Sequence, residues 1–279
     1  KMLKRDGGRE TLRAFFIGRH SAIVDAEHVE DVIVPTARLR CRFDPAEPSM
    51  IKVHHLDHSR SLRVLWMLEE LGLPYQVVNY QRDPKTWLAP QALRDVHPLG
   101  KSPVLQDDTL VLAESGAILE YLADRYDSGR QLSPEPMPAQ APERVRYRYW
   151  MHYAEGSAMP PLVMTLVFSR LRKAPMPFFA KPIARSIADK ALKGFVGPQV
   201  KLHMDWMERE LGQSPWFAGE RFTAADIQMS FPIQAAAARG GDMAAYPRLQ
   251  AYLARIEQRP AYQRAVERGG SLNLGGGSR

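Results

Sequence analysis

From residue 51 onward, apolar and polar positions alternate in patterns that predict strands and helices in turn. Residues 51–56 and 75–80 are rich in β-branched and aromatic side chains and predict two strands. Between them, residues 59–71 predict a helix with one apolar face, made by Val64, Met67, Leu68 and Leu71. Gly72 and Pro74 end this helix. A strand, helix and strand in this order predict a parallel pair joined by a right-handed crossover.

The following residues predict a strand pair and another helix. After a short helix and loop over 84–96, residues 103–105 and 110–112 form two short strands around the turn residues Asp107 and Asp108. Residues 115–126 predict a helix whose sheet-facing side carries Ile118, Leu119, Leu122 and Tyr126. This order of elements over roughly eighty residues suits a thioredoxin-like domain.

The rest of the chain is helical in character. Residues 128–142 hold four prolines and predict a linker, and the residues beyond it predict five to seven helices without strands. We therefore expect an α/β thioredoxin-like N-terminal domain at 50–130 and an all-α C-terminal helical domain at 141–270. Residues 1–49, which lack steady periodicity, are expected to form a poorly ordered extension, and residues 271–279 a flexible tail.

Composition narrows the class of protein. The chain of 279 residues is 45% hydrophobic and 25% charged, as in ordinary globular proteins, and we expect no membrane span and no secretory signal. A single cysteine, Cys41, rules out a disulfide within this chain and a CxxC redox site, and it fits a reducing, cytoplasmic location. His54, His55 and His58 form the one tight histidine group, and we expect no metal site there.

Much of the net charge of +7 lies in one segment. Between Arg170 and Lys201 the chain has eight basic residues against only Asp189. Such a segment is typical of a solvated helical face and also of a surface for anionic lipid or an acidic partner. We interpret it as a solvated face, with weak peripheral membrane association as the alternative. No zinc-finger or RNA-recognition pattern is present, so nucleic acid is not an expected partner.

Four motifs carry a family resemblance through their order and spacing. They are residues 56–75, which begin LDHSRSLR and end LEELGLPY, residues 97–105 (HPLGKSPVL), residues 112–118 (LAESGAI) and residues 219–227 (GERFTAADI). Together they resemble the glutathione transferases over nearly all of residues 50–270. Residues 153–157, followed by Pro160 and Pro161, resemble a bacterial and fungal branch of that family.

The resemblance implies an enzyme that activates the thiol of glutathione, its co-substrate, and conjugates it to small electrophiles. It also implies a homodimer with a role in detoxification. A free thiol has a pKa of about 8.5, so an enzyme must stabilise the reactive thiolate at neutral pH. Two alternatives remain: a glutathione-dependent peroxidase or dehalogenase at the same site, or a non-catalytic ligand-binding or scaffold protein on the same fold.

The family places its thiol-activating group just after the first strand, where this chain has Ser59. Ser59 resembles the serine of the theta-like classes, four residues before an arginine that here is Arg63. A hydroxyl that donates a hydrogen bond to sulfur favours the thiolate, and the start of a helix adds a favourable dipole. Ser59 could instead only cap the helix, and Ser61, Arg60 or His58 could take the catalytic place.

The resemblance further implies a set of residues that hold glutathione: Lys101, Ser102, Pro103, Glu114 and Ser115. In the family this proline is cis and exposes the amide and carbonyl of the preceding residue, here Ser102, which pair with the cysteinyl part of glutathione. Lys101 would meet the glycyl carboxylate. The Ser115 hydroxyl and the first helix amides would hold the γ-glutamyl carboxylate, and Glu114 would balance its ammonium group, unless both residues serve only as a helix cap.

The second substrate is expected between the two domains, against Trp150, Tyr153 and Met159. A stripe of aromatic and methionine side chains is more often core than pocket, so core packing is the alternative. Thr223 and Asp226 resemble a helix capping box and are expected to be structural.

Overall fold

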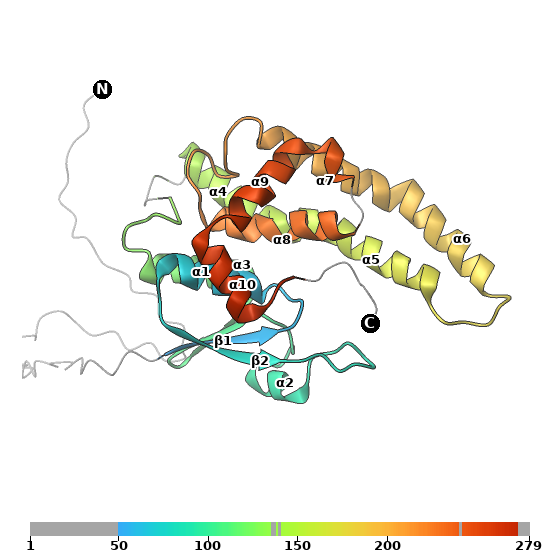
Figure 1. Cartoon of the computed structure of the whole chain (residues 1–279), viewed down its shortest axis with the longest axis horizontal. Coiled ribbons are helices and arrows are strands. Elements are labelled where there is room, and N and C mark those ends of the chain that lie inside the picture. Colours follow the sequence, from blue (N-terminus) through green and yellow to red (C-terminus); the bar gives the residue numbers. More distant parts are fainter. Residues whose placement is uncertain (1–49, 135–137, 139–140, 240–241, 273–279) are drawn as a thin grey trace, which may run out of the picture. The chain divides into compact units, whose positions relative to one another are not determined.

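The structure divides into a first half that contains a sheet and a second half made of helices (Figure 1). This computed structural model describes residues 50–134, 138, 141–239 and 242–272. The extension expected at 1–49, part of the expected linker and the tail from residue 273 onward lie outside the described residues.

The sheet has four strands in the order β2-β1-β3-β4. β1 (Ile51–Leu56) pairs in parallel with β2 (Tyr75–Tyr80), whereas β3 (Val104–Asp107) pairs antiparallel with both β1 and β4 (Leu110–Ala113). The parallel pair and the antiparallel hairpin predicted from the sequence are both confirmed.

Helix α1 (Ser61–Leu71) begins two residues later than expected. Arg60 is the residue before its first turn, so Ser59 lies outside the helix in the turn that follows β1. The helix ends at Gly72, whose left-handed backbone (φ +64°) lets its amide reach the carbonyls of Leu68 and Glu69. All residues from Ser61 to Glu69 are buried, because α1 lies between the sheet and the helical half.

Two further helices belong to the sheet half. They are α2 (Gln91–Val96) and α3 (Ser115–Tyr126). Ile118, Leu119 and Leu122 of α3 are fully buried, as their spacing predicted. Tyr126 is only half-buried, but its hydroxyl contacts the sheet by donating a hydrogen bond of 2.6 Å to Asp107 at the end of β3.

The helical half contains seven α-helices within the described residues, the upper end of the expected number. Two long rods are each interrupted by one turn of π-helix: α4 (Pro142–Tyr153), η1 (Ala154–Ala158) and α5 (Met159–Lys173), then α6 (Lys181–Ala191), η2 (Leu192–Val196) and α7 (Gly197–Glu210). The remaining elements are α8 (Ala224–Ala238), the short 3₁₀ turn η3 (Met243–Ala245), α9 (Pro247–Glu257) and α10 (Pro260–Gly269).

Helix α8 forms the centre of the helical half. Almost every residue in it is buried, and it begins with the predicted capping box, in which Asp226 accepts hydrogen bonds from the amide and hydroxyl of Thr223. Asp226 also accepts one from the amide of Phe217, so it fixes the preceding loop to the helix. Burial raises the pKa of Asp226 to about 7, although these three donors favour its carboxylate. The structural role expected of the capping box is confirmed.

The last helix returns to the sheet half, which the sequence patterns did not predict. α10 lies beside α1 in Figure 1, and the two helices are joined by ion pairs. Arg259 contacts Glu70 at 2.6 Å and Arg264 contacts Glu69 at 2.7 Å. At the end of α10, Gly269 packs closely on Leu65 and His55, and a Cβ atom there would overlap the Leu65 side chain and force it to shift. The helical half therefore closes over the helix that begins at the candidate site.

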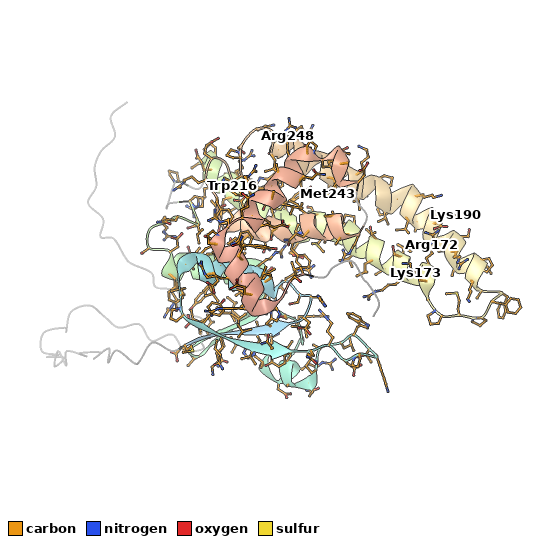
Figure 2. All side chains as sticks on the ribbon, viewed as in Figure 1. Arg172, Lys173, Lys190, Trp216, Met243 and Arg248 are labelled. Atoms are coloured by element: carbon orange, nitrogen blue, oxygen red, sulfur yellow. The ribbon has the colours of Figure 1, made fainter. Side chains whose placement is uncertain are left out.

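Helices α5 and α6 form a hairpin that extends away from the sheet (Figure 1). Arg172 and Lys173 lie at the end of α5, and Lys190 lies near the end of α6 (Figure 2). Within the described part of the chain, no helix combines the length and the apolar content that a membrane crossing requires.

Candidate active site

Two predicted site residues, 43 positions apart in sequence, meet where β1 turns into α1. The hydroxyl of Ser59 lies 3.2 Å from that of Ser102 and donates a hydrogen bond to it. Ser102 in turn donates to the carbonyl of His54 at 2.9 Å and accepts from the amide of Leu56 at 3.2 Å. The end of β1 thus holds Ser102 in place, and Ser102 helps to hold Ser59.

The Ser102–Pro103 peptide bond is cis, which confirms the expectation. Ser102 uses its side chain, not its backbone, to contact β1. Within the described residues, neither its amide nor its carbonyl has a hydrogen-bond partner. Both groups are therefore available to an extended ligand beside the sheet.

Ser59 does not cap α1 in the ordinary way. Its oxygen accepts a long hydrogen bond of 3.3 Å from the amide of Ser61, the first helical residue, and lies 2.7 Å from the hydroxyl of Ser61. The Ser59 side chain is thus fixed at the N-terminal end of α1, where the helix dipole favours negative charge. Capping and catalysis are compatible, because the oxygen accepts from the helix while its hydrogen remains a donor.

A buried histidine that sequence reasoning did not assign completes this cluster. The hydroxyl of Ser61 lies 2.7 Å from Nδ1 of His55, and both residues are buried. Burial lowers the pKa of His55 more than the nearby carboxylate of Asp57 raises it, so its ring is neutral at pH 7. The alternation of side chains along β1 could have predicted that His55 lies on the helix-facing side of the strand. It could not have predicted the contact between His55 and Ser61.

Arg63 joins the site to the helical half. Its guanidinium, which is fully buried, lies 2.5 Å from the carboxylate of Glu155 in η1 and donates to the backbone carbonyl of Gln228 in α8. The same carboxylate accepts from Arg60 at 2.8 Å. Burial lowers the pKa of Arg63 to about 10, but Glu155 opposes this effect and Arg63 remains charged at pH 7.

Glu155 is held as a carboxylate by the two arginines. Burial alone would raise its pKa, but the charge of Arg63 and the hydrogen bond from Arg60 outweigh burial and lower it. The family motif at 153–157 includes Glu155, yet its spacing could not show that the residue meets α1. The arrangement fixes the start of α1 against the helical half.

Glu114 and Ser115 lie where β4 turns into α3. Glu114 is exposed and has a left-handed backbone (φ +72°), which is uncommon for a residue with a side chain and is found at functional turns. The hydroxyl of Ser115 already has two protein partners, since it accepts from Arg63 at 3.0 Å and donates to Gln228 at 3.2 Å. The role of this hydroxyl in binding a carboxylate stays a prediction, whereas the first amides of α3 are the donors that a helix start leaves without partners.

Lys101 is exposed in the loop before β3, next to Ser102. The structure thus brings Ser59, Ser102 and Pro103 to one end of the sheet, and Lys101 precedes Ser102 in the chain. Ser115 is linked to α1 through its hydrogen bond with Arg63. The role of each residue toward glutathione stays a prediction.

The three residues expected in the second-substrate pocket are buried in the helical core. Trp150 packs against Phe217 and Tyr153, with ring centroids 4.7 and 5.0 Å away, and Met159 belongs to the same core. Tyr153 also hydrogen-bonds His203 in α7 at 2.5 Å. This burial favours the core-packing alternative, and the pocket assignment stays a prediction.

Among the described residues, no group of three or more histidine, cysteine, aspartate or glutamate side chains is arranged to hold a metal ion. The site is built instead from hydroxyls, backbone amides and an arginine–glutamate contact. A thioredoxin-like sheet with an open backbone pair beside a serine at a helix start, followed by an all-helical domain, is the arrangement that the sequence resemblance implied for a glutathione transferase.

Comparison with known proteins gives the same class. Residues 59–125 match the model of the glutathione S-transferase N-terminal domain, and residues 197–255 match that of the C-terminal domain. Glutathione S-transferase 1 of Saccharomyces cerevisiae is 35% identical over 233 residues, which cover 80% of this chain and 97% of the yeast protein. The chain therefore belongs to the glutathione S-transferase family.

Solved structures support this assignment. A glutathione S-transferase from Actinobacillus pleuropneumoniae is 35% identical, with a TM-score of 0.65, and the match covers 82% of this chain and 97% of that one. A sphingomonad glutathione S-transferase solved in complex with glutathione is 26% identical, with a TM-score of 0.60 and coverage of 78% and 98%. The predicted fold class and the prediction of a glutathione transferase enzyme are confirmed.

Proposed function

We propose that Ser59 activates the thiol of glutathione for conjugation to small electrophiles. The observation that carries this proposal is the position of the Ser59 hydroxyl, at the start of α1 and 3.2 Å from the hydroxyl of Ser102. Ser102 has an unpaired amide and carbonyl within the described chain, and we infer that a cysteinyl group paired with them has its sulfur on the side where Ser59 lies.

Activation of the thiol requires only that the Ser59 hydroxyl change its hydrogen-bond acceptor. In the free enzyme the Ser59 hydroxyl donates to that of Ser102 at 3.2 Å, and its oxygen lies 2.7 Å from the hydroxyl of Ser61. When glutathione is bound, the hydroxyl turns toward sulfur and the thiol proton leaves to solvent. The thiolate then bonds to the electrophilic carbon, and the displaced electron pair departs with a leaving group or moves to the far end of the attacked double bond. A hydrogen bond to a charged sulfur is stronger than one to a neutral thiol, so Ser59 lowers the thiol pKa.

The remaining predicted residues bind parts of glutathione away from sulfur. We assign the γ-glutamyl carboxylate to the first amides of α3 and its ammonium group to Glu114, which is exposed beside them. We assign the glycyl carboxylate to Lys101. This division predicts that mutation of Ser59 changes turnover more than glutathione affinity.

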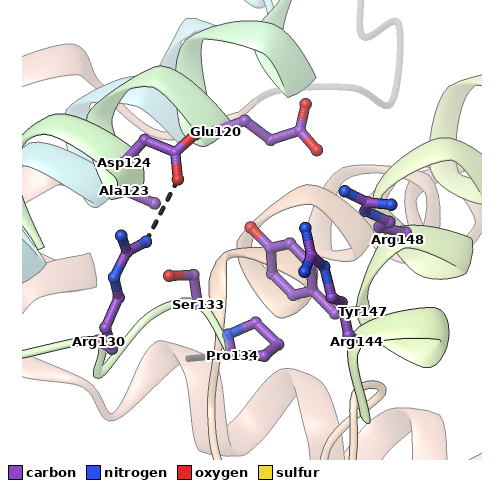
Figure 3. A pocket seen from close by; sticks show the side chains of 9 residues that line it. All are labelled: Glu120, Ala123, Asp124, Arg130, Ser133, Pro134, Arg144, Tyr147 and Arg148. Atoms are coloured by element: carbon purple, nitrogen blue, oxygen red, sulfur yellow. Dashed lines mark hydrogen bonds and ion pairs between the residues drawn. The ribbon is translucent and has the colours of Figure 1, made fainter. Parts of the chain in front are cut away.

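We also propose that the protein is a homodimer that pairs through α3 and α4. A polar cleft with a volume of about 330 Å³ lies between the two helices (Figure 3). Glu120 on α3 lines one side of it, and Arg148 on α4 lines the other, whereas Asp124 is already paired with Arg130, which also lines the cleft, at 3.3 Å. Such a surface is complementary to itself under twofold symmetry, because the acidic helix of one copy can face the basic helix of the other.

Charge reversal tests this assembly. Glu120→Arg should shift the protein from dimer to monomer in light scattering after gel filtration, because it sets like charges against each other. Adding Arg148→Glu should restore the dimer. A dimer that resists the single reversal would place the interface elsewhere.

The same proposal includes a role in detoxification and a cytoplasmic location. Detoxification and a cytoplasmic location are compatible with the family and with a chain that has one cysteine. The site favours no particular electrophile.

The test of the catalytic role is the rate of conjugation against pH for the wild type, Ser59→Ala and Ser61→Ala, each with its glutathione affinity measured separately. Ser59→Ala should lower turnover at neutral pH by about ten- to a hundredfold while affinity changes little, and higher pH should recover part of the loss. Full activity in Ser59→Ala with loss in Ser61→Ala would move the assignment to Ser61. If neither change matters, the serine mechanism is wrong.

A further inference from the structure

The α5–α6 hairpin, residues 170–193, exposes large apolar side chains at its tip. Phe178 and Phe179, in the loop between the helices, are 84% and 67% exposed, and Ile183 and Ile187 on α6 are 63% and 54% exposed. A cluster of this kind is unusual on a protein surface, because exposing each apolar side chain to water is unfavourable. Such a cluster typically marks a site of contact with another molecule.

These side chains form a surface and do not point inward. Ile183 and Ile187 are one helical turn apart, so they lie on the same face of α6. Ala188, the buried residue of this helix, is rotated from Ile187 by about 100°, so the buried side of α6 differs from the side that carries the two isoleucines. The two phenylalanine rings touch edge to face, with centroids 5.7 Å apart, just before the helix begins. The loop and the helix that follows it therefore each expose two large apolar side chains.

The same hairpin is strongly basic. It carries seven exposed basic residues: Arg170, Arg172, Lys173, Lys181, Arg185, Lys190 and Lys193. Its one acidic residue, Asp189, is paired with Arg172 at 3.2 Å. Arg172, Lys173 and Lys190 lie along both helices of the hairpin in Figure 2. The apolar tip is thus surrounded by positive charge from two helices.

We propose that the α5–α6 hairpin binds the surface of an anionic lipid bilayer. Phe178 and Phe179 enter the headgroup region, Ile183 and Ile187 follow along the interface, and the basic side chains contact lipid phosphates. Insertion is shallow, since no described helix is long and apolar enough to cross a membrane.

Charge favours lipid over a second copy of the chain as the occupant. Two hairpins brought face to face would set several positive charges against each other, with Asp189 as the single negative charge on each side. An anionic bilayer offers an apolar interior to the exposed apolar side chains and negative charge to the basic residues of the hairpin. This inference does not depend on the role of Ser59, because binding to vesicles is measured without glutathione.

The experiment is cosedimentation of the whole chain with vesicles of phosphatidylcholine alone or mixed with phosphatidylserine. We expect binding to the mixed vesicles at low salt, binding at least about tenfold weaker at physiological salt, and little binding to phosphatidylcholine. Equal binding to both vesicle types, or none to the mixed vesicles at low salt, would overturn the proposal.

Two pairs of variants locate the contact. Phe178→Ser/Phe179→Ser should weaken binding to mixed vesicles about tenfold or more, whereas Val111→Ser, at an exposed position on β4, should not. Arg185→Glu/Lys190→Glu should weaken it by a similar factor. Lys85→Glu/Arg221→Glu, which makes the same change in net charge at exposed positions elsewhere, should have a much smaller effect.

Melting temperature and conjugation activity show that each variant is folded. If the control reversal weakens binding as much as the hairpin reversal, binding depends on net charge and the hairpin is not the site. If Phe178→Ser/Phe179→Ser separates a dimer in gel filtration and leaves vesicle binding unchanged, the apolar tip contacts a second copy and the proposal is wrong.

Discussion

The start of α1 and the α5–α6 hairpin depart in opposite ways from the usual distribution of polar and apolar side chains. At the start of α1, Ser59, Ser61 and Arg63 are polar or charged and yet buried. On the hairpin, Phe178 and Phe179 are apolar and yet exposed. Each arrangement costs free energy unless something compensates it.

The difference lies in where the compensation comes from. Around α1 the partners belong to the same chain: Ser102, His55, Glu155 and Gln228 supply most of the hydrogen bonds. Of the three side chains, only Arg63 has a buried nitrogen, Nε, without a hydrogen-bond partner in the described residues. Around the hairpin, no element of the described chain covers Phe178, the most exposed of the large apolar residues. Buried polar groups with partners thus indicate a preorganised site, whereas exposed apolar groups indicate a contact with another molecule.

Among changes within these two regions, the largest effect should follow from breaking the charged contact at the site. Arg63→Met leaves Glu155 without its buried partner and the backbone carbonyl of Gln228 without the donor from Arg63, so it should lower the free energy of unfolding by about 3 kcal/mol. Arg60→Met is the matched control, because Arg60 is about one-third exposed and should cost about 1 kcal/mol or less. Urea denaturation measures both, and equal losses would show that burial of Arg63 does not matter.

A smaller loss should come from the hydroxyl that joins Ser59 to His55. Ser61→Ala removes the buried hydrogen bond between its hydroxyl and Nδ1 of His55, which should cost about 1–3 kcal/mol. Ser230→Ala is the control, since its buried hydroxyl bonds only the carbonyl of Ile227 in its own helix and should cost less. The two free energies of unfolding come from the same urea titration, and a larger loss in Ser230→Ala would contradict the buried network.

Removing the hairpin phenylalanines should have the smallest effect on stability. Phe178→Ser/Phe179→Ser should change the free energy of unfolding by no more than about 0.5 kcal/mol, because both rings are exposed. Leu119→Ala, at a fully buried position in α3, should cost about 2–5 kcal/mol for comparison. A clear loss of melting temperature in the double variant would show that the rings pack within the fold.

The same two regions show what the sequence can predict. The order of strands and helices follows from periodicity, and the motifs around Ser59 and Ser102 are sufficient for the family and the cis bond. The network around Arg63 could not be predicted, because its partners Glu155 and Gln228 lie 92 and 165 residues away. Only the packed fold brings them together.

The hairpin could not be predicted for a different reason. Ile183 and Ile187 have the spacing of a buried helix face, and periodicity alone cannot show whether such a face is covered. The basic residues around it are equally compatible with a solvated surface. Its exposure became visible only when the neighbours of α6 were known.

The pKa of the glutathione thiol bound to the enzyme tests the central claim most directly. It is read from the ultraviolet absorbance of the thiolate across pH, for the wild type and Ser59→Ala at saturating glutathione. We predict that the wild type lowers the pKa from about 8.5 to near or below neutrality, and that Ser59→Ala raises it again by about one to two units, or roughly 1.4–2.7 kcal/mol. Bound glutathione that stays a thiol at neutral pH in the wild type, or the same pKa in both proteins, would contradict the account.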